Sequence, residues 1–144
     1  MSPLQAVYWA VLFATTSIAF WKGGQPERLT AVALFTASLA TPIFVMSLFS
    51  APEFGVLAID VLLLGWLVWL AVTNDRFWPL PAAGFHLVGT VIHVVRILDP
   101  SIIQFAYAHA QAFWAYPVFA ALIWGSLVEA PASRARHAPR SEDL

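Results

Sequence analysis

Long apolar stretches alternate with short polar joints along almost the whole chain. A hydrocarbon core about 30 Å thick is crossed by about 20 apolar residues in a helix, so each stretch has the length of one transmembrane helix. The five stretches are Leu4 to Trp21, Leu29 to Phe49, Phe54 to Val72, Pro79 to Leu98 and Ile102 to Val128. This pattern predicts an all-α, polytopic membrane helical bundle of five transmembrane helices, with four helices as the alternative.

The basic residues predict how this bundle is oriented. The joints are so short that neighbouring helices must be antiparallel. With five helices, six of the seven Lys and Arg residues fall on one side of the membrane, and only Arg96 falls on the other. Because cytoplasmic loops carry an excess of positive charge, we expect the N-terminus outside and the C-terminus inside. Omitting one helix would separate the C-terminal arginines from at least one earlier basic joint, so the charges favour an odd number of helices.

The composition changes after residue 129, where Pro, Ala, Ser, Arg and acidic residues predominate. A segment of this kind cannot bury enough apolar surface to offset the entropy that it loses on ordering. We therefore expect two parts, a transmembrane helical domain over residues 1–129 and a disordered cytoplasmic tail over residues 130–144.

The overall composition agrees with a membrane protein and excludes several other classes. The chain is 60% hydrophobic and 10% charged, with a mean hydropathy of +0.77, whereas soluble domains are roughly 25% charged. It contains no cysteine, which excludes disulfides, iron–sulfur clusters and cysteine nucleophiles. A net charge of −1 with scattered basic residues gives no nucleic-acid footprint. The expected surroundings are the lipid bilayer, with other membrane-protein subunits or a second copy of the chain as candidate partners.

Two prolines, Pro42 and Pro117, fall inside the long apolar stretches. Each removes a backbone donor and clashes with the carbonyl four residues earlier, so a kink is predicted at each position. Such kinks occur in purely structural bundles as well as around cavities.

A few ionisable side chains fall within the predicted helices, where each costs roughly 2.5 to 3.5 kcal/mol at the helix centre. Counted from the outer ends of their helices, Asp60, His93 and His109 lie at similar depths. Arg96 follows His93 on the same helix face, and Gln104 begins the next helix. We therefore predict an intramembrane polar cluster of five residues, which are Asp60, His93, Arg96, Gln104 and His109.

This cluster has three interpretations. In the leading one, Asp60 accepts hydrogen bonds from His93 or Arg96 and locks the helices together, without a cofactor. In the second, His93 and His109 ligate one haem b iron from opposite faces, which would make the protein a single-haem membrane electron carrier. In the third, Asp60 and His93 exchange protons, as a proton-coupled carrier requires.

Other chemistry finds less support in the sequence. His86 lies near the face of His93 and about 10.5 Å deeper, but it has no partner histidine for a second haem. Two histidines and one aspartate suit zinc or iron, yet no spacing motif fixes such a site, and no metal site is predicted. No nucleophilic triad is visible, and the hydroxyls of Thr36, Ser38, Thr41 and Ser47 are more simply explained by hydrogen bonds to their own helix or by contacts between helices. The chain is more readily interpreted as a protein without catalysis of its own.

Two predicted cytoplasmic joints have distinctive sequences, Gly23-Gly24-Gln25-Pro26-Glu27-Arg28 and Asp75-Arg76-Phe77-Trp78-Pro79-Leu80. In the first joint, the two glycines are predicted to end a helix with a positive-φ cap, and Glu27 to complement the dipole of the next helix. In the second joint, Asp75 is predicted to cap the helix that follows.

These GGxPER and DRxWPL joints, together with Asp60, His93 and the Leu98-Asp99-Pro100 turn, resemble a group of small polytopic bacterial inner-membrane proteins with no established activity. The resemblance extends from Trp21 to Pro100. It implies the bacterial inner membrane and a shared fold, and it carries over no catalytic role. The expected function is that of a non-catalytic subunit, scaffold or accessory factor.

Overall fold

The computed structural model describes the backbone of residues 2–47, 52–99, 101 and 104–138. Within these ranges the side chains of residues 43–47, 52–53 and 104–112 are left out of the description. The helices are α1 (Pro3–Lys22), α2 (Gln25–Ser47), α3 (Pro52–Thr73), α4 (Pro79–Leu98), α5 (Gln104–Trp124), the π-helical turn η1 (Gly125–Glu129) and α6 (Ala130–Arg136). The described chain is helical throughout and contains no strand, so the predicted all-α helical bundle is confirmed.

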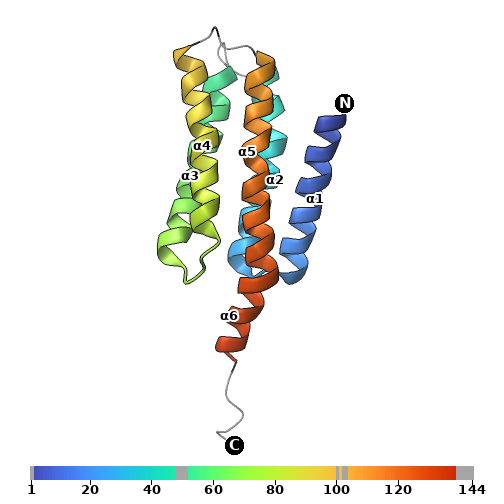
Figure 1. Cartoon of the computed structure of the whole chain (residues 1–144), viewed down its shortest axis with the longest axis vertical. Coiled ribbons are helices and arrows are strands. Elements are labelled where there is room, and N and C mark those ends of the chain that lie inside the picture. Colours follow the sequence, from blue (N-terminus) through green and yellow to red (C-terminus); the bar gives the residue numbers. More distant parts are fainter. Residues whose placement is uncertain (1, 48–51, 100, 102–103, 139–144) are drawn as a thin grey trace, which may run out of the picture.

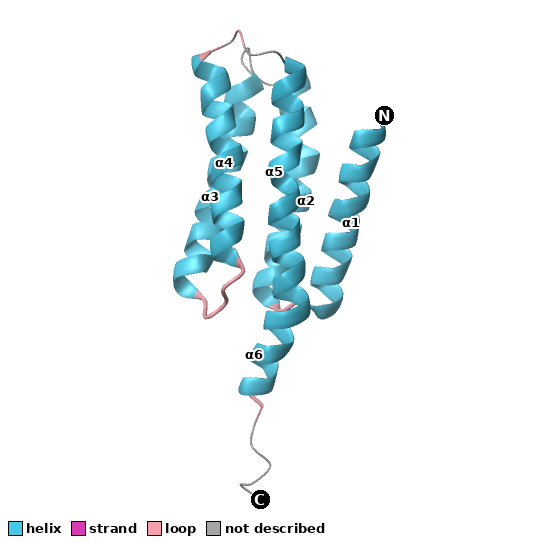
Figure 2. Ribbon diagram, viewed as in Figure 1, coloured by secondary structure: helices cyan, strands magenta, loops and turns pink. Residues whose placement is uncertain are grey.

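The long helices run side by side, and each is antiparallel to the one before it (Figure 1). The most extensive contacts join α4 to α5 and α3 to α4, while α1 packs at the edge against α2 and α5. The N-terminus and the C-terminal helix α6 lie at opposite ends of the bundle, as five passes require (Figure 2). Short turns connect α1 to α2 and α3 to α4 at the end from which α6 projects.

Four described segments are long and apolar enough to cross a membrane, so the chain is a multi-pass membrane protein. These segments are Pro3–Lys22, Phe54–Thr73, Pro79–Leu98 and Phe113–Arg136. The second half of α2 includes side chains that the structure leaves undescribed, but α2 packs against α1 and α3 and carries no charged residue between positions 29 and 46.

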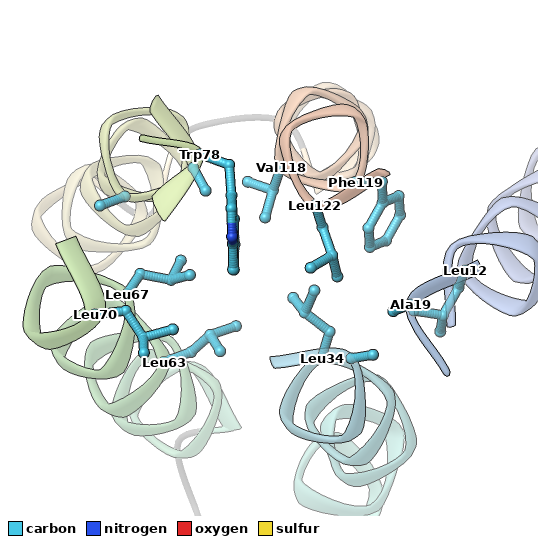
Figure 3. Close-up of a cluster of buried hydrophobic side chains, with 13 residues drawn as sticks. Leu12, Ala19, Leu34, Leu63, Leu67, Leu70, Trp78, Val118, Phe119 and Leu122 are labelled. Atoms are coloured by element: carbon cyan, nitrogen blue, oxygen red, sulfur yellow. The ribbon is translucent and has the colours of Figure 1, made fainter. Parts of the chain in front are cut away.

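Large apolar side chains cover the outside of the bundle, which is the arrangement that lipid favours. Trp21 and Leu98 are each 78% exposed and Leu62 is 74% exposed. The interior is filled by buried side chains, among them Leu67, Leu122 and Trp78 (Figure 3). Since lipid removes most of the hydrophobic drive between helices, close packing and polar contacts must hold them together.

The C-terminal segment differs from the prediction at residues 130–136, where we expected disorder and the structure has helix α6. The π-helical turn η1 continues α5 directly into α6, and Ala130 is completely buried. The guanidinium of Arg134 donates to the carbonyl oxygen of Lys22 at 2.9 Å, which ties α6 to the end of α1. Composition alone could not reveal this tertiary contact.

The C-terminal end of α4 carries the polar side chains that follow His93 in the sequence. Asp99 ends the helix, and the backbone and side chain of Ser101 donate to its Oδ1 atom at 3.0 and 2.5 Å. These hydrogen bonds, with Arg96 nearby, hold the pKa of the exposed Asp99 carboxyl below its ordinary value.

Helices α2 and α5 continue through Pro42 and Pro117, so neither proline ends its helix. Pro117 lines an apolar groove of about 390 Å³ on the surface between α4 and α5, together with Phe85 and Trp124. The kinks at the two positions stay a prediction.

Replacing Gly125 by alanine is expected to destabilise the bundle, because the added methyl group would overlap the indole ring of Trp78. Overpacking of this kind costs about 1–3 kcal/mol, which thermal unfolding in detergent would detect as a lower midpoint. The matched control is Gly84→Ala, where nothing lies within 4 Å of the added group and alanine is the better helix former by about 1 kcal/mol. Equal effects of the two substitutions would contradict the packing of Trp78 on Gly125.

Candidate functional site

Helices α3 and α4 meet through a carboxylate and an imidazole within the membrane-spanning region. The Oδ2 atom of Asp60 lies 2.7 Å from Nε2 of His93, and the two side chains are 14% and 3% exposed. Each group alone would cost several kcal/mol in the apolar interior, so the pair offsets a penalty that neither residue could bear singly. The contact expected between Asp60 and another member of the predicted cluster is therefore present.

A second histidine of α4, His86, joins this pair. Its Nε2 atom lies 3.0 Å from the backbone oxygen of Asp60 and 3.9 Å from Oδ1 of the same residue. The seven-residue spacing between His86 and His93 places both on one face of α4, about 10.5 Å apart along the helix axis. This spacing was visible in the sequence, but only a histidine was sought as partner for His86, and the partner is Asp60.

The remaining members of the predicted cluster are placed less fully. Arg96 lies one turn beyond His93, is half-buried, and has Asp99 within electrostatic range. The side chains of Gln104 and His109 lie outside the description, although both residues belong to α5. The described cluster therefore consists of Asp60, His86 and His93, with Arg96 above it.

Helices α1, α2 and α5 also contribute polar groups near this level. The hydroxyl of Tyr8 on α1 lies 2.7 Å from the hydroxyl of Ser38 on α2. Tyr8 is also within electrostatic range of Asp60 and of Tyr116 on α5. Each of the five long helices thus places at least one polar side chain in the same part of the bundle interior.

The described geometry does not fit haem ligation through Nε2 of His93. That nitrogen faces the Asp60 carboxylate at 2.7 Å, and iron would have to displace it. The Nε2 atom of His86 is also turned to Asp60. Among the described residues, no group of three His, Cys, Asp or Glu side chains is arranged to hold a metal ion.

A second polar network occupies the opposite end of the bundle, where the GGxPER and DRxWPL joints meet. Its centre is Glu27, which is completely buried in the first turn of α2. The Glu27 carboxylate accepts hydrogen bonds from the backbone N–H of Gly24 and from Nε1 of Trp78, both at 2.8 Å. It also forms an ion pair with Arg76, whose Nη1 atom lies 2.9 Å from Oε1.

The glycines of the first joint serve this network by their lack of a side chain. Our prediction of a positive-φ cap was wrong, because Gly23 is extended at φ −70° and no described glycine has a positive φ. A Cβ atom on Gly24 would lie 2.9 Å from Nη2 of Arg76 and 3.1 Å from Oε2 of Glu27. A side chain at this position would force the Arg76 guanidinium or the Glu27 carboxylate to shift, so glycine lets both groups approach the backbone closely.

The start of α4 is capped from a distant helix, so the predicted cap by Asp75 was also wrong. The Oε2 atom of Glu129 accepts hydrogen bonds from the backbone N–H groups of Phe77 at 2.8 Å and Trp78 at 3.3 Å. Asp75 makes no such bond, since it lies exposed in the turn before the helix. A long-range cap satisfies the free N–H groups equally well and ties η1 to α4.

Both joints are distinctive in the sequence, but the sequence does not show that they meet. A usable signal was present, because Glu27 and Arg76 are opposite charges that adjoin apolar stretches on the same predicted side of the membrane. In a protein with so few charges, each one at a helix end needs a partner. Trp78 carried no comparable signal, since an aromatic residue at a helix end is also an ordinary membrane anchor.

Comparison of the chain with protein-family models, with curated proteins and with solved structures finds no match.

Removing the central carboxylate is expected to weaken the fold more than removing an exposed one. Glu27→Ala leaves the Arg76 guanidinium without its partner and two donors without an acceptor, at an expected cost of about 3 kcal/mol. Asp75→Ala removes the neighbouring exposed carboxylate and should change the unfolding free energy by no more than about 0.5 kcal/mol. The measurement is the free energy of unfolding in detergent for both variants. A loss for Glu27→Ala as small as that for Asp75→Ala would show that the Glu27 network does not stabilise the fold.

Proposed function

We propose that the chain is a non-catalytic subunit or accessory protein of the bacterial inner membrane, with its N-terminus outside and its C-terminus in the cytoplasm. The observation that carries this proposal is the contact of 2.7 Å between Asp60 and His93. In this role the pair is an internal lock that holds α3 against α4. The partners would be the lipid bilayer and either another membrane-protein subunit or a second copy of the chain.

The way in which the hydroxyl groups are used supports a structural role. Most described hydroxyls on the helices donate to a carbonyl of their own helix, one turn earlier. Thr90 donates to His86, and Ser126 to Leu122. Thr36 and Thr41 do the same with Val32 and Ala37, which is one of the two explanations that the sequence left open. A hydroxyl that donates to a carbonyl of its own helix has its hydrogen-bond donor satisfied locally and is not positioned as a nucleophile.

A proton-coupled carrier is the second candidate, and one specific observation favours it. The Asp60 carboxylate lies between the two imidazoles, 2.7 Å from Nε2 of His93 and 3.9 Å from Nε2 of His86. Three protonatable groups in series along the membrane normal are a common element of proton pathways. A haem carrier is less well supported, because it would require His93 to turn its Nε2 atom away from Asp60.

Double-variant analysis separates a mutual lock from two independent residues. Asp60→Ala and His93→Ala should each lower the unfolding free energy by about 1–2 kcal/mol, the upper range for polar contacts between membrane helices. The double variant should lose little more, because each single change already breaks the contact. Val91→Ala, which changes an exposed side chain on α4, serves as the control. Full additivity of the two losses would contradict the lock.

An absorption spectrum and a transport assay test the two alternatives. The purified protein is expected to give a featureless visible spectrum when oxidised and when reduced with dithionite. A sharp reduced band that is lost in both His93→Ala and His109→Ala would overturn the structural proposal in favour of a cytochrome. In proteoliposomes with an internal pH dye, proton movement that Asp60→Asn abolishes without unfolding the protein would overturn it in favour of the carrier.

A further inference from the structure

A polar pocket of about 370 Å³ lies where α6 projects beyond the bundle. It is lined by Asp75 and Arg76 from the turn before α4, and by Ser133, Arg136 and His137 from α6 and its end. The pocket exists because η1 carries the chain straight on into α6 instead of releasing it as a loose tail. It is remote from the Asp60 cluster and belongs to neither candidate function above.

The exposed charge around this pocket is positive. Among the described residues at this end of the bundle, the exposed charged side chains are four basic ones against one acidic one, namely Lys22, Arg28, Arg134 and Arg136 against Asp75. When the paired Arg76 and Glu27 and the partly exposed Glu129 are included, the described charges at this end are five basic against three acidic, which is still net positive. Glu27 is completely buried against Arg76, and Glu129 is engaged with backbone N–H groups. A phosphate anion is the chemical group that such donors recognise best.

The same end of the bundle is ringed by exposed aromatic side chains. Trp21 is 78% exposed, Phe77 is 67% exposed and Trp124 is 57% exposed. Tryptophan and other amphipathic rings gather where the hydrocarbon core meets the lipid headgroups. Exposed rings at this end of the bundle favour a position of the pocket near the lipid phosphates.

An apolar groove that suits a lipid chain is lined by the residues that directly follow two pocket residues in the sequence. Phe77 and Trp78, which directly follow Asp75 and Arg76, line the apolar groove between α4 and α5 that also includes Phe85 and Pro117. A ligand with a charged head and an apolar chain meets suitable surfaces on both sides of residues 75–78. Free phosphate would use only one of them.

We propose that this pocket binds the headgroup of an anionic phospholipid whose phosphodiester carries a hydroxylated substituent, as in phosphatidylglycerol. Arg136 and Arg76 bind the phosphate oxygens, and the Ser133 hydroxyl donates to the same group. Asp75 would repel a bare phosphate, so its presence at the rim is explained by a headgroup hydroxyl that donates to it. The inference goes beyond the structural role proposed above and does not depend on it.

Binding of defined lipids to the full chain tests the pocket. Native mass spectrometry of the detergent-purified protein would compare added phosphatidylglycerol with phosphatidylcholine, and phosphatidylglycerol should bind about tenfold more tightly. Arg136→Gln should remove most of this preference. The matched control is Arg28→Gln, an exposed arginine at the same end that does not line the pocket, and it should retain the preference. If both variants lost the preference for phosphatidylglycerol equally, the preference would come from the general surface charge, and the proposed binding site would be wrong.

Two further arms identify the ligand. Inorganic phosphate should not compete with phosphatidylglycerol at equal concentration, and effective competition would overturn the assignment to a lipid. Asp75→Asn should weaken binding of phosphatidylglycerol but not of phosphatidic acid, which lacks the headgroup hydroxyls. An increase in binding of both lipids would overturn the role given to Asp75. Unchanged unfolding midpoints without added lipid would confirm that these variants remain folded.

Discussion

The hydrocarbon core contains no water, so every polar group within it must find its partner inside the protein. In this bundle several of these polar contacts are made to α4. Asp60 of α3 contacts the His86 and His93 side chains on one face of the helix. At the start of the helix, Glu27 of α2 contacts the Trp78 side chain and Glu129 of η1 contacts the backbone. Carboxylates from three other elements therefore determine where α4 lies.

These contacts also explain why small residues occupy two particular places. Gly24 lets Arg76 and Glu27 approach the backbone of the first joint, and Gly125 lets the Trp78 indole lie against η1. The buried indole then fills the space between α4 and α5, with Val118 and Leu122 beside it (Figure 3). Polar pairing and apolar packing therefore depend on the same residue, because the Trp78 side chain donates to Glu27 and is also part of the buried core.

The two ends of the bundle differ in their polar groups. Near one end, imidazoles and a carboxylate are enclosed among helices, which suits a lock and would also suit proton exchange. At the other end, the completely buried Glu27 carboxylate pairs with Arg76, which also lines the polar pocket beside α6.

The sequence by itself determined the all-helical class of the protein and the antiparallel order of its long helices, because the apolar stretches and short joints allow few other arrangements in a bilayer. It also placed Asp60 and His93 at one depth. Only the tertiary structure decided that His86 shares their cluster, that Glu27 pairs with Arg76, and that α6 continues the last helix. Depth follows from counting residues along each helix, whereas partners depend on how each helix is rotated and which neighbour it meets, and the spacing within one helix does not contain that information.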